Sequence, residues 1–176
     1  MKNIQKEIAT IRSGKFDSVY LILGEEQYFI EQIREAIIEH ALDEDSIDLN
    51  FVNYDMEEVA ISEALFEASS FPFFGERKVV FVQNPFFLTG QKAKNAPNHS
   101  LDEIMDYLEN PADFSILVFF APYEKLDRRK KVTKLLEKTA TIVDVSSPYP
   151  NEASQYIKEI VKEKGYHFSD EAFQLF

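Results

Sequence analysis

Continuous hydrophobic runs alternate with stretches of helical periodicity along the first 146 residues of the chain. The runs predict strands, because a strand that is buried on both faces is apolar throughout rather than at every second position. The predicted strands are 19–23, 49–54, 78–83, 115–120 and 141–145. Between them, apolar residues recur every three or four positions, and this spacing predicts helices over 3–13, 25–42, 55–69 (with Asp55 as its cap), 101–109 and 126–138.

This alternation predicts an α/β fold, a mostly parallel sheet with helices on both faces. Residues 84–100 contain two prolines, a glycine and several amides, and they predict a loop. A break with two prolines at 146–150 is followed only by helical periodicity. We therefore expect a first domain over 1–146 and the beginning of a helical second domain over 147–176. The last predicted helix has run only about two turns when the chain ends, so we expect the front part of a longer protein.

Composition narrows the classes of protein to which the chain can belong. Hydrophobic residues make up 45% and charged residues 28% of the sequence, which is typical of a soluble globular protein. The net charge of -12 repels DNA phosphates, so we expect no nucleic-acid binding by the chain alone, unless a local basic patch or partner proteins supply positive charge. The chain has no cysteine, which excludes disulfides and thiolate metal sites.

The chain shows no sign of a membrane segment. Its start carries an acidic residue early and has no apolar run, unlike a signal peptide. The longest apolar stretch, 116–122, is much shorter than the ~20 residues that a membrane-spanning helix needs. We therefore expect a cytoplasmic protein that makes no contact with membranes.

The turn after the first predicted strand lies where a phosphate-binding loop would be expected. Such a loop needs several glycines, a lysine for the outer phosphates, and a serine or threonine for magnesium. Here Gly24 is followed by Glu25 and Glu26, whose carboxylates suit the positive end of a helix dipole and repel a triphosphate. We expect this turn to be a capped start of a helix, and the chain to bind and hydrolyse no nucleotide by itself.

Other catalytic chemistry lacks its residues as well. The predicted strands that end near Asn84 and Ala121 do not close with the acidic pair that would organise magnesium. His40, His99 and His167 are scattered, and no metal-binding spacing links them. We expect no catalytic residue, no cofactor and no metal in this chain.

One segment between a predicted helix and a predicted strand is unusually apolar, although loops at such positions are mostly polar. It contains Phe71, Pro72, Phe73 and Phe74 in succession. Pro72 can start a short helical turn that Gly75 ends, with the last two rings pointing in different directions. The rings either fill the edge of the core or form a hydrophobic plug for a partner's pocket. Burying one phenylalanine is worth roughly 1.5–3 kcal/mol, so two make a plausible hot spot.

A dense basic run, Arg128 to Lys131, follows Asp127 at the start of a predicted helix. A solvated face is the default interpretation of such a run. A contact with an acidic neighbouring subunit is the alternative, and the residues alone leave both open.

Three stretches together resemble the delta subunit family of bacterial DNA polymerase III. The first, 19–30, is similar to the family's opening strand, its Gly-Glu-Glu turn and the helix that follows. The second, Phe73 to Val80, is similar to the family's L/F-F-x-x-R-[KRQ] segment, which leads into an apolar strand. The third is 101–138, where a helix, an apolar strand and a charged helix follow in the family's order. The resemblance covers essentially the whole chain.

The resemblance implies a fold of the AAA+ type, with a RecA-like α/β domain over 1–146 and a small helical lid domain that begins at 147. The rest of the lid and the family's helical collar would follow the present sequence. The family's delta subunit binds no ATP, in agreement with the argument from Gly24. It has no catalytic activity of its own and belongs to the DNA polymerase III holoenzyme, a DNA-directed DNA polymerase.

The resemblance also implies a role in DNA replication. The family's delta subunit opens the ring-shaped beta sliding clamp by inserting an adjacent apolar pair into a hydrophobic pocket, and it works with the delta-prime and tau/gamma subunits of the clamp loader. The pair corresponds to Phe73 and Phe74, with Phe71 and Pro72 as support. The family more often has leucine at the first position, so Phe73 keeps the apolar character and changes the shape.

Two other classes of function are weighed against this one. An ATP-using AAA+ enzyme with divergent motifs is disfavoured, because no Lys-Ser/Thr pair follows Gly24. An α/β adaptor unrelated to replication fits the same pattern of strands and helices. Binding to a sliding clamp discriminates the adaptor from the clamp-loader subunit, and ATP binding discriminates the enzyme.

Overall fold

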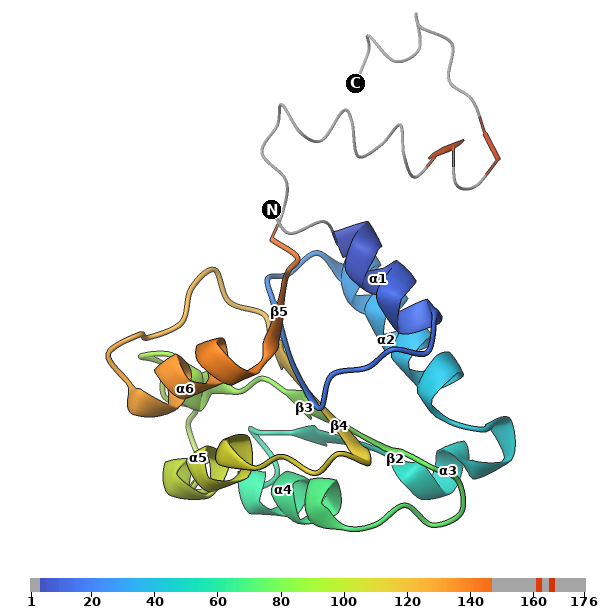
Figure 1. Ribbon diagram of the computed structural model, residues 1–176. Coiled ribbons are helices and arrows are strands. Elements are labelled where there is room, and N and C mark those ends of the chain that lie inside the picture. The colour runs from blue at the N-terminus through green and yellow to red at the C-terminus, as the bar shows by residue number, and fades with distance from the viewer. Residues whose placement is uncertain (1–3, 147–160, 163–164, 167–176) are drawn as a thin grey trace, which may run out of the picture. The chain divides into compact units, whose positions relative to one another are not determined.

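A single five-stranded sheet organises the first of the chain's two units, residues 1–146 (Figure 1). The computed structural model of the chain describes residues 4–146, 161–162 and 165–166. Residues 147–176 form a separate compact unit. The helical domain predicted there falls almost entirely outside the described residues and stays a prediction.

Five parallel strands build the sheet in the order β2-β3-β4-β1-β5. The strands are β1 (Val19–Leu23), β2 (Phe51–Asp55), β3 (Lys78–Gln83), β4 (Ser115–Ala121) and β5 (Thr141–Asp144). The three central strands are buried on both faces, as their uninterrupted apolar runs predict. The predicted α/β fold with a parallel sheet is confirmed.

Helices cover both faces of this sheet (Figure 1). On one face lie α1 (Ile4–Arg12) and α2 (Gln27–Ala41), and on the other lie α4 (Ile61–Ser69), α5 (Leu101–Glu109) and α6 (Lys131–Thr139). Short helical turns η1 (Glu44–Ser46), α3 (Ile47–Asn50) and η2 (Phe86–Leu88) complete the described elements. The parallel sheet places all strand starts at one edge and all strand ends at the other.

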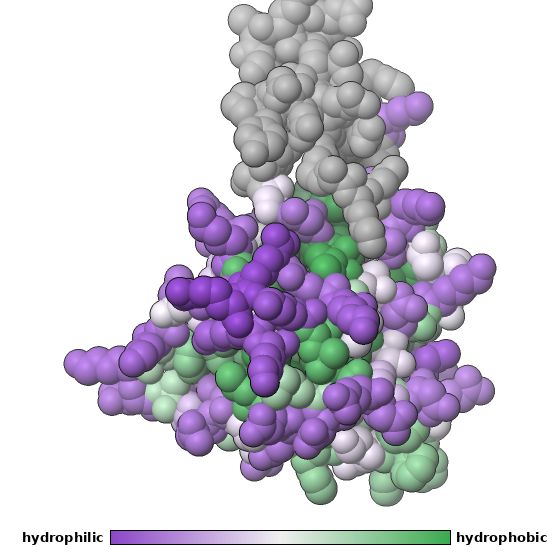
Figure 2. All heavy atoms as spheres, turned by 60° about the vertical axis from the view of Figure 1, so that its left-hand side comes forward, coloured by the Kyte–Doolittle hydropathy of each residue, from purple (hydrophilic) through white to green (hydrophobic). Residues whose placement is uncertain are grey.

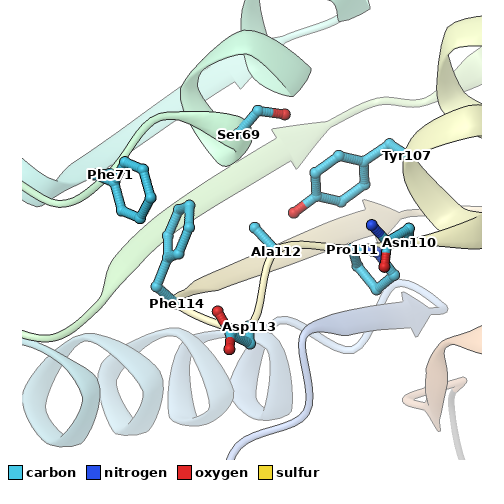
Figure 3. A pocket seen from close by; sticks show the side chains of 8 residues that line it. All are labelled: Ser69, Phe71, Tyr107, Asn110, Pro111, Ala112, Asp113 and Phe114. Atoms are coloured by element: carbon cyan, nitrogen blue, oxygen red, sulfur yellow. The ribbon is translucent and has the colours of Figure 1, made fainter.

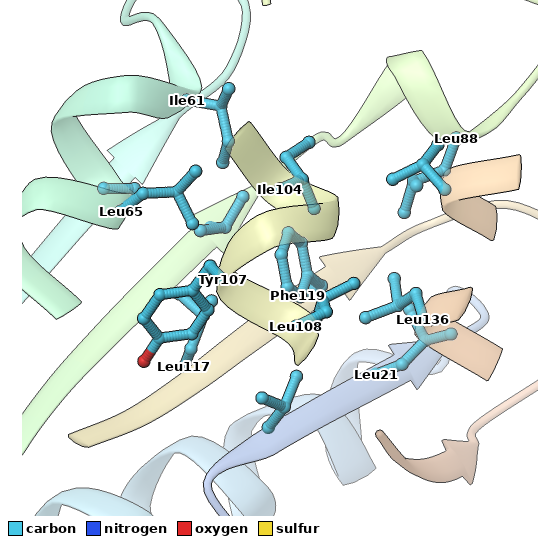
Figure 4. Close-up of a cluster of buried hydrophobic side chains, with 14 of the residues drawn as sticks. Leu21, Ile61, Leu65, Leu88, Ile104, Tyr107, Leu108, Leu117, Phe119 and Leu136 are labelled. Atoms are coloured by element: carbon cyan, nitrogen blue, oxygen red, sulfur yellow. The ribbon is translucent and has the colours of Figure 1, made fainter. Parts of the chain in front are cut away.

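The largest hydrophobic cluster lies between the sheet and helices α4, α5 and α6 (Figure 4). Alternate residues of the strands point into it, while their neighbours face α1 and α2. Its labelled members are Leu21, Ile61, Leu65, Leu88, Ile104, Tyr107, Leu108, Leu117, Phe119 and Leu136. Each buried leucine, isoleucine or phenylalanine contributes roughly 1.5–3 kcal/mol, so this cluster is a main source of the domain's stability.

The region around β2 departs from the prediction in two ways. Leu49 lies in α3 rather than in a strand and is half exposed, and β2 begins at Phe51. Asp55 does not cap a helix but ends β2, where its carboxylate accepts a hydrogen bond from the backbone N–H of Glu57 at 2.9 Å. Helix α4 begins only at Ile61. Because β2 is an edge strand, it is half-buried rather than buried on both faces.

Helix α6 begins at Lys131, five residues later than predicted. The preceding turn is held by Asp127, whose carboxylate accepts hydrogen bonds from the backbone N–H and the guanidinium of Arg129. These hydrogen bonds lower the pKa of Asp127 to about 2. A short acidic side chain that binds the backbone two residues later favours a turn over a helix, which explains the late start.

His99 caps helix α4 from the loop that precedes α5. The backbone N–H of Ile61 donates to His99 Nδ1 at 3.1 Å, and Nε2 lies 2.9 Å from the carbonyl of Met56. This arrangement requires the neutral ring with its proton on Nε2. Ala60, the residue at the cap position, has a side chain that cannot accept a hydrogen bond, so His99 satisfies a helix N–H from 38 residues away.

We expect the His99 cap to make folding stability depend on pH. Burial lowers the pKa of His99 below its ordinary value of 6.5, so the unfolded chain takes up a proton first as the pH falls. The contribution of the neutral ring is complete above pH 6.5 and is lost as the pH falls from 6.5 towards the folded-state pKa. Urea unfolding of His99→Gln should therefore show a smaller loss of stability between pH 7 and pH 5.5 than the parent chain.

The matched control is His40→Gln, because His40 contacts only the Ala36 carbonyl on its own helix. In that variant the His99 cap is intact, so the loss of stability that the cap carries between pH 7 and pH 5.5 should remain. An unchanged pH dependence in His99→Gln would show that the cap does not carry this effect.

Candidate protein-binding site at the amino edge of the sheet

The phenylalanine-rich segment lies between α4 and β3, at the edge where the strands begin. Phe71, Phe73 and Phe74 are 80%, 63% and 75% exposed, and Pro72 is half-buried. The rings therefore do not fill the edge of the core, which was one of the two interpretations of this segment. The predicted helical turn from Pro72 is also wrong, since the segment is a series of bends.

Phe73 and Phe74 form the tip of this segment. Their rings pack edge to face, with centroids 5.0 Å apart and planes at 82°. Phe74 has a φ of 62° and is followed by Gly75 with a φ of 85°. A bulky residue in the left-handed region is strained by about 1–3 kcal/mol and persists only where its surroundings impose the conformation. The tip is therefore a defined shape rather than a loose loop.

The side chain of Asn50 imposes that conformation. Its Oδ1 accepts a hydrogen bond from the backbone N–H of Phe73 at 2.7 Å. Its Nδ2 donates to the carbonyl oxygens of Phe73 at 3.2 Å and Phe74 at 2.6 Å. Asn50 is the last residue of α3 and only 1% exposed, so the amide has no competing water. Asn50 lies within the predicted strand 49–54, and no local pattern in the sequence indicates its role.

The base of the segment is fixed as well. Lys78, the first residue of β3, is 6% exposed and forms a salt bridge of 2.8 Å with Glu67 near the end of α4. The ring of Phe71 packs on Phe114, with centroids 4.6 Å apart. An open pocket lies next to these rings, lined by Ser69, Phe71, Tyr107 and residues 110–114 (Figure 3). The backbone that carries the exposed rings is therefore fixed by contacts at the start of the segment, at its end and at its tip.

The opposite edge of the sheet holds the turn at Gly24. Two of the backbone N–H groups at this turn are already used, since Gly24 donates to the carbonyl of Ala121 and Glu26 donates to that of Val145, both at 3.1 Å. Gly24 has a φ of 120°, and a Cβ there would lie 2.4 Å from the nitrogen of Ser146. The backbone of residues 145–146, directly after β5, therefore lies against this turn, where a phosphate loop would be expected. Helix α2 begins at Gln27, and Glu26 at its cap position makes no side-chain cap hydrogen bond.

The small pocket at this edge is poorly suited to a triphosphate. Among the described residues that line it, the one cation is Arg34, whose guanidinium stacks on the rings of Phe81 and Phe120 at 5.1 and 5.2 Å. Glu31 also lines the pocket, 3.8 Å from Arg34. In the part of the chain that the structure describes, no group of His, Asp or Glu could hold a metal ion.

The basic run before α6 has partners within the chain. Arg128 contacts Glu137 at 3.0 Å, Arg129 contacts Asp127 at 2.9 Å, and the Lys130 ammonium donates to the carbonyl of Phe87 at 2.8 Å. Hydrophilic side chains dominate the face that includes this region (Figure 2). Both arginine side chains are largely exposed, which fits a solvated face, and a contact with an acidic neighbouring subunit stays a prediction.

None of the described helices has the length and apolar character needed to cross a membrane.

The comparisons with known proteins agree with one another. The family model of the DNA polymerase III delta subunit matches residues 20–146. The DNA polymerase III subunit delta of Bacillus subtilis is 35% identical over 153 residues, which cover 87% of this chain and 44% of that protein. The solved structure of the Bacillus subtilis DNA clamp loader delta protein is 33% identical and superposes with a TM-score of 0.85 over 92% of this chain and 48% of that one.

A DNA polymerase III gamma subunit-related protein of Thermotoga maritima shares only the fold, at 16% identity and a TM-score of 0.51 over 92% of this chain and 52% of that one. The fold expected from the resemblance, an AAA+ type α/β domain, is confirmed by the clamp loader delta structure. The chain spans slightly less than half the length of the Bacillus subtilis proteins that it matches. By the match of the family model and of these relatives, the chain belongs to the DNA polymerase III delta subunit family.

Proposed function

We propose that this chain is the clamp-binding part of a clamp-loader delta subunit, and that Phe73 and Phe74 enter a hydrophobic pocket on the beta sliding clamp. The observation that carries the proposal is a pair of adjacent, largely exposed phenylalanines on a backbone held by a buried asparagine. Exposure of two apolar rings to water is unfavourable in free energy, and burial of the rings in a partner's pocket removes this cost. Phe71 and Pro72, which precede the pair in the chain, would add apolar surface to the contact.

The energy available from this contact suits a binding hot spot. Burial of each ring is worth roughly 1.5–3 kcal/mol, so the pair supplies about 3–6 kcal/mol. Because the tip is held before binding, little of that energy is spent on ordering it. The acidic net charge of -12 leaves the contact with DNA to the assembled loader, with its delta-prime and tau/gamma subunits.

Ring opening follows if the pair binds the open clamp better than the closed one. A ligand shifts a conformational equilibrium only by its difference in affinity for the two states. A shift from about 1:99 to 99:1 needs a difference of about 5.5 kcal/mol. The two rings supply energy of this order when the pocket accepts them fully only in the open clamp.

ATP would act through other subunits of the loader. The Gly24 turn has no lysine and no magnesium-binding hydroxyl, and the N–H groups of Gly24 and Glu26 are bonded to the carbonyls of Ala121 and Val145. Calorimetric titration of the chain with the beta clamp of the same organism should show saturable binding, and titration with MgATP should show none. Absence of clamp binding would overturn the proposal, and tight ATP binding would favour an ATP-using enzyme.

A clamp that is locked shut distinguishes opening from simple binding. A clamp variant is made with a pair of cysteines introduced across its subunit interface. The oxidised, crosslinked ring is then compared with the same ring after reduction. We expect the chain to bind the crosslinked ring at least about tenfold more weakly, since the open state is no longer accessible. Equal affinities in surface plasmon resonance would show that the chain binds the clamp without favouring its opening.

A further inference from the structure

We infer that Asn50 is a positioning residue for the clamp contact: it holds the Phe73–Phe74 tip in the conformation that binds. The inference rests on the proposed clamp-binding function and names the part of the fold that prepares the tip for it. Asn50 precedes β2 by one residue and lies 23 positions from Phe73, so it joins two segments that are distant in the chain.

The amide matches the backbone of the tip group by group. An asparagine side chain has one carbonyl oxygen and two N–H donors. The oxygen accepts from the Phe73 N–H, and the two donors bind the Phe73 and Phe74 carbonyls. All three bonds are to backbone atoms, so Asn50 controls the path of the chain at the tip.

The tip also packs closely against residues 43–50, the segment that ends in Asn50. Gly75 is so close to it that an added Cβ would lie 3.3 Å from Asp43 Oδ2, 3.6 Å from Ser46 Oγ and 3.8 Å from Asn50 Nδ2. Ser46 is itself buried and donates to the carbonyl of Asp43. The turn formed by residues 43–50 is therefore a base on which the strained φ of Phe74 is maintained.

Loss of this base lowers the fraction of molecules that display the binding conformation. The apparent affinity falls in proportion to that fraction, and the loss is found in the association rate, because the bound complex keeps its contacts. A residue that contacts the clamp directly would change the dissociation rate instead. The two rates therefore distinguish positioning from contact.

The test uses Asn50→Ala and Asn50→Asp in the full chain, with Asn53→Ala as the matched control. Asp keeps the acceptor for Phe73 but places a carboxylate oxygen against two carbonyls. Asn53 lies three residues away in β2, and its side chain accepts only from Gln83. We expect both Asn50 variants to reduce the association rate with the beta clamp about tenfold, and Asn53→Ala to leave it unchanged.

Amide exchange measured by NMR provides a readout without the clamp. The Phe73 N–H should be protected in the parent chain and exposed to exchange in Asn50→Ala, while the amides of β1, β3 and β4 stay protected. Gly75→Ala is a second variant that keeps the Asn50 amide and strains the tip, because Gly75 has a φ of 85° and an added Cβ would lie 3.3 Å from Asp43 Oδ2. It should show the same fall in association rate. A Phe73 amide that stays protected, with unchanged rates in both Asn50→Asp and Gly75→Ala, overturns the inference.

The Phe73→Ala/Phe74→Ala background separates this inference from the proposed function. In that background, Asn50→Ala should cause no further loss of affinity, since the groups it positions are gone. If the double alanine variant binds the clamp like the parent chain, the proposed function fails. If it loses binding while the Asn50 variants keep the parent's association rate, only the positioning role fails.

Discussion

Replacement of Phe73 and Phe74 together by alanine is expected to weaken binding to the beta clamp by a factor of about 100 to 10,000. The range follows from two rings that each bury at roughly 1.5–3 kcal/mol, with 1.4 kcal/mol for each tenfold change in affinity. The fold should be unaffected, because both rings are largely exposed in the free chain. Urea unfolding should give a free energy within about 0.5 kcal/mol of the parent value.

The matched control for this variant is Phe66→Ala. Phe66 lies on α4 and is 68% exposed, so it has the residue type and a similar exposure to the pair but lies outside the segment that Asn50 holds. Its removal should leave clamp affinity unchanged. An equal loss of affinity in Phe66→Ala would show that the clamp binds exposed apolar side chains non-specifically. Marked destabilisation of the Phe73→Ala/Phe74→Ala variant would show that its rings are part of the hydrophobic core.

Replacement of Gly24 by alanine is expected to cost the fold about 3 kcal/mol or more, measured as the free energy of unfolding in urea. The φ of 120° is a conformation that side-chain-bearing residues rarely adopt. The added Cβ would also lie 2.4 Å from Ser146 N and 2.5 Å from the carbonyl carbon of Val145. Both atoms belong to the backbone, so residues 145–146 after β5 must move, and this disturbs the pairing of β5 with β1.

Gly14→Ala separates the two causes of this loss. Gly14 also has a positive φ, of 76°, but a Cβ there meets no atom within 4 Å. Its replacement should cost about 1–2 kcal/mol, the penalty of the left-handed conformation alone. Equal losses at Gly14 and Gly24 would mean that the close approach of residues 145–146 contributes nothing.

The positions of four of the five strands could be predicted from the sequence to within one residue. A strand that is buried on both faces needs an unbroken apolar run, and this requirement is local. The exception is the edge strand β2, where Leu49 extends the apolar run but belongs to α3. Half of such a strand faces solvent, so apolarity no longer marks its start.

Two helix starts were harder to predict, one because its capping group comes from elsewhere in the fold and one because a local turn competes with the helical periodicity. Helix α4 depends on His99, which is 38 positions away, and the start of α6 is delayed by the turn at Asp127. Periodicity reports which face of a helix is apolar but not which distant group satisfies its first N–H groups.

The sequence by itself determined the alternation of strands and helices and the absence of phosphate-loop chemistry at Gly24, since apolar runs and missing residue types are properties of the local chain. It also placed Phe73 and Phe74 next to each other. Only the tertiary structure decided that these rings face solvent and that Asn50 holds their backbone, because burial and hydrogen bonds between residues 23 positions apart arise when the strand starts meet at one edge of the sheet.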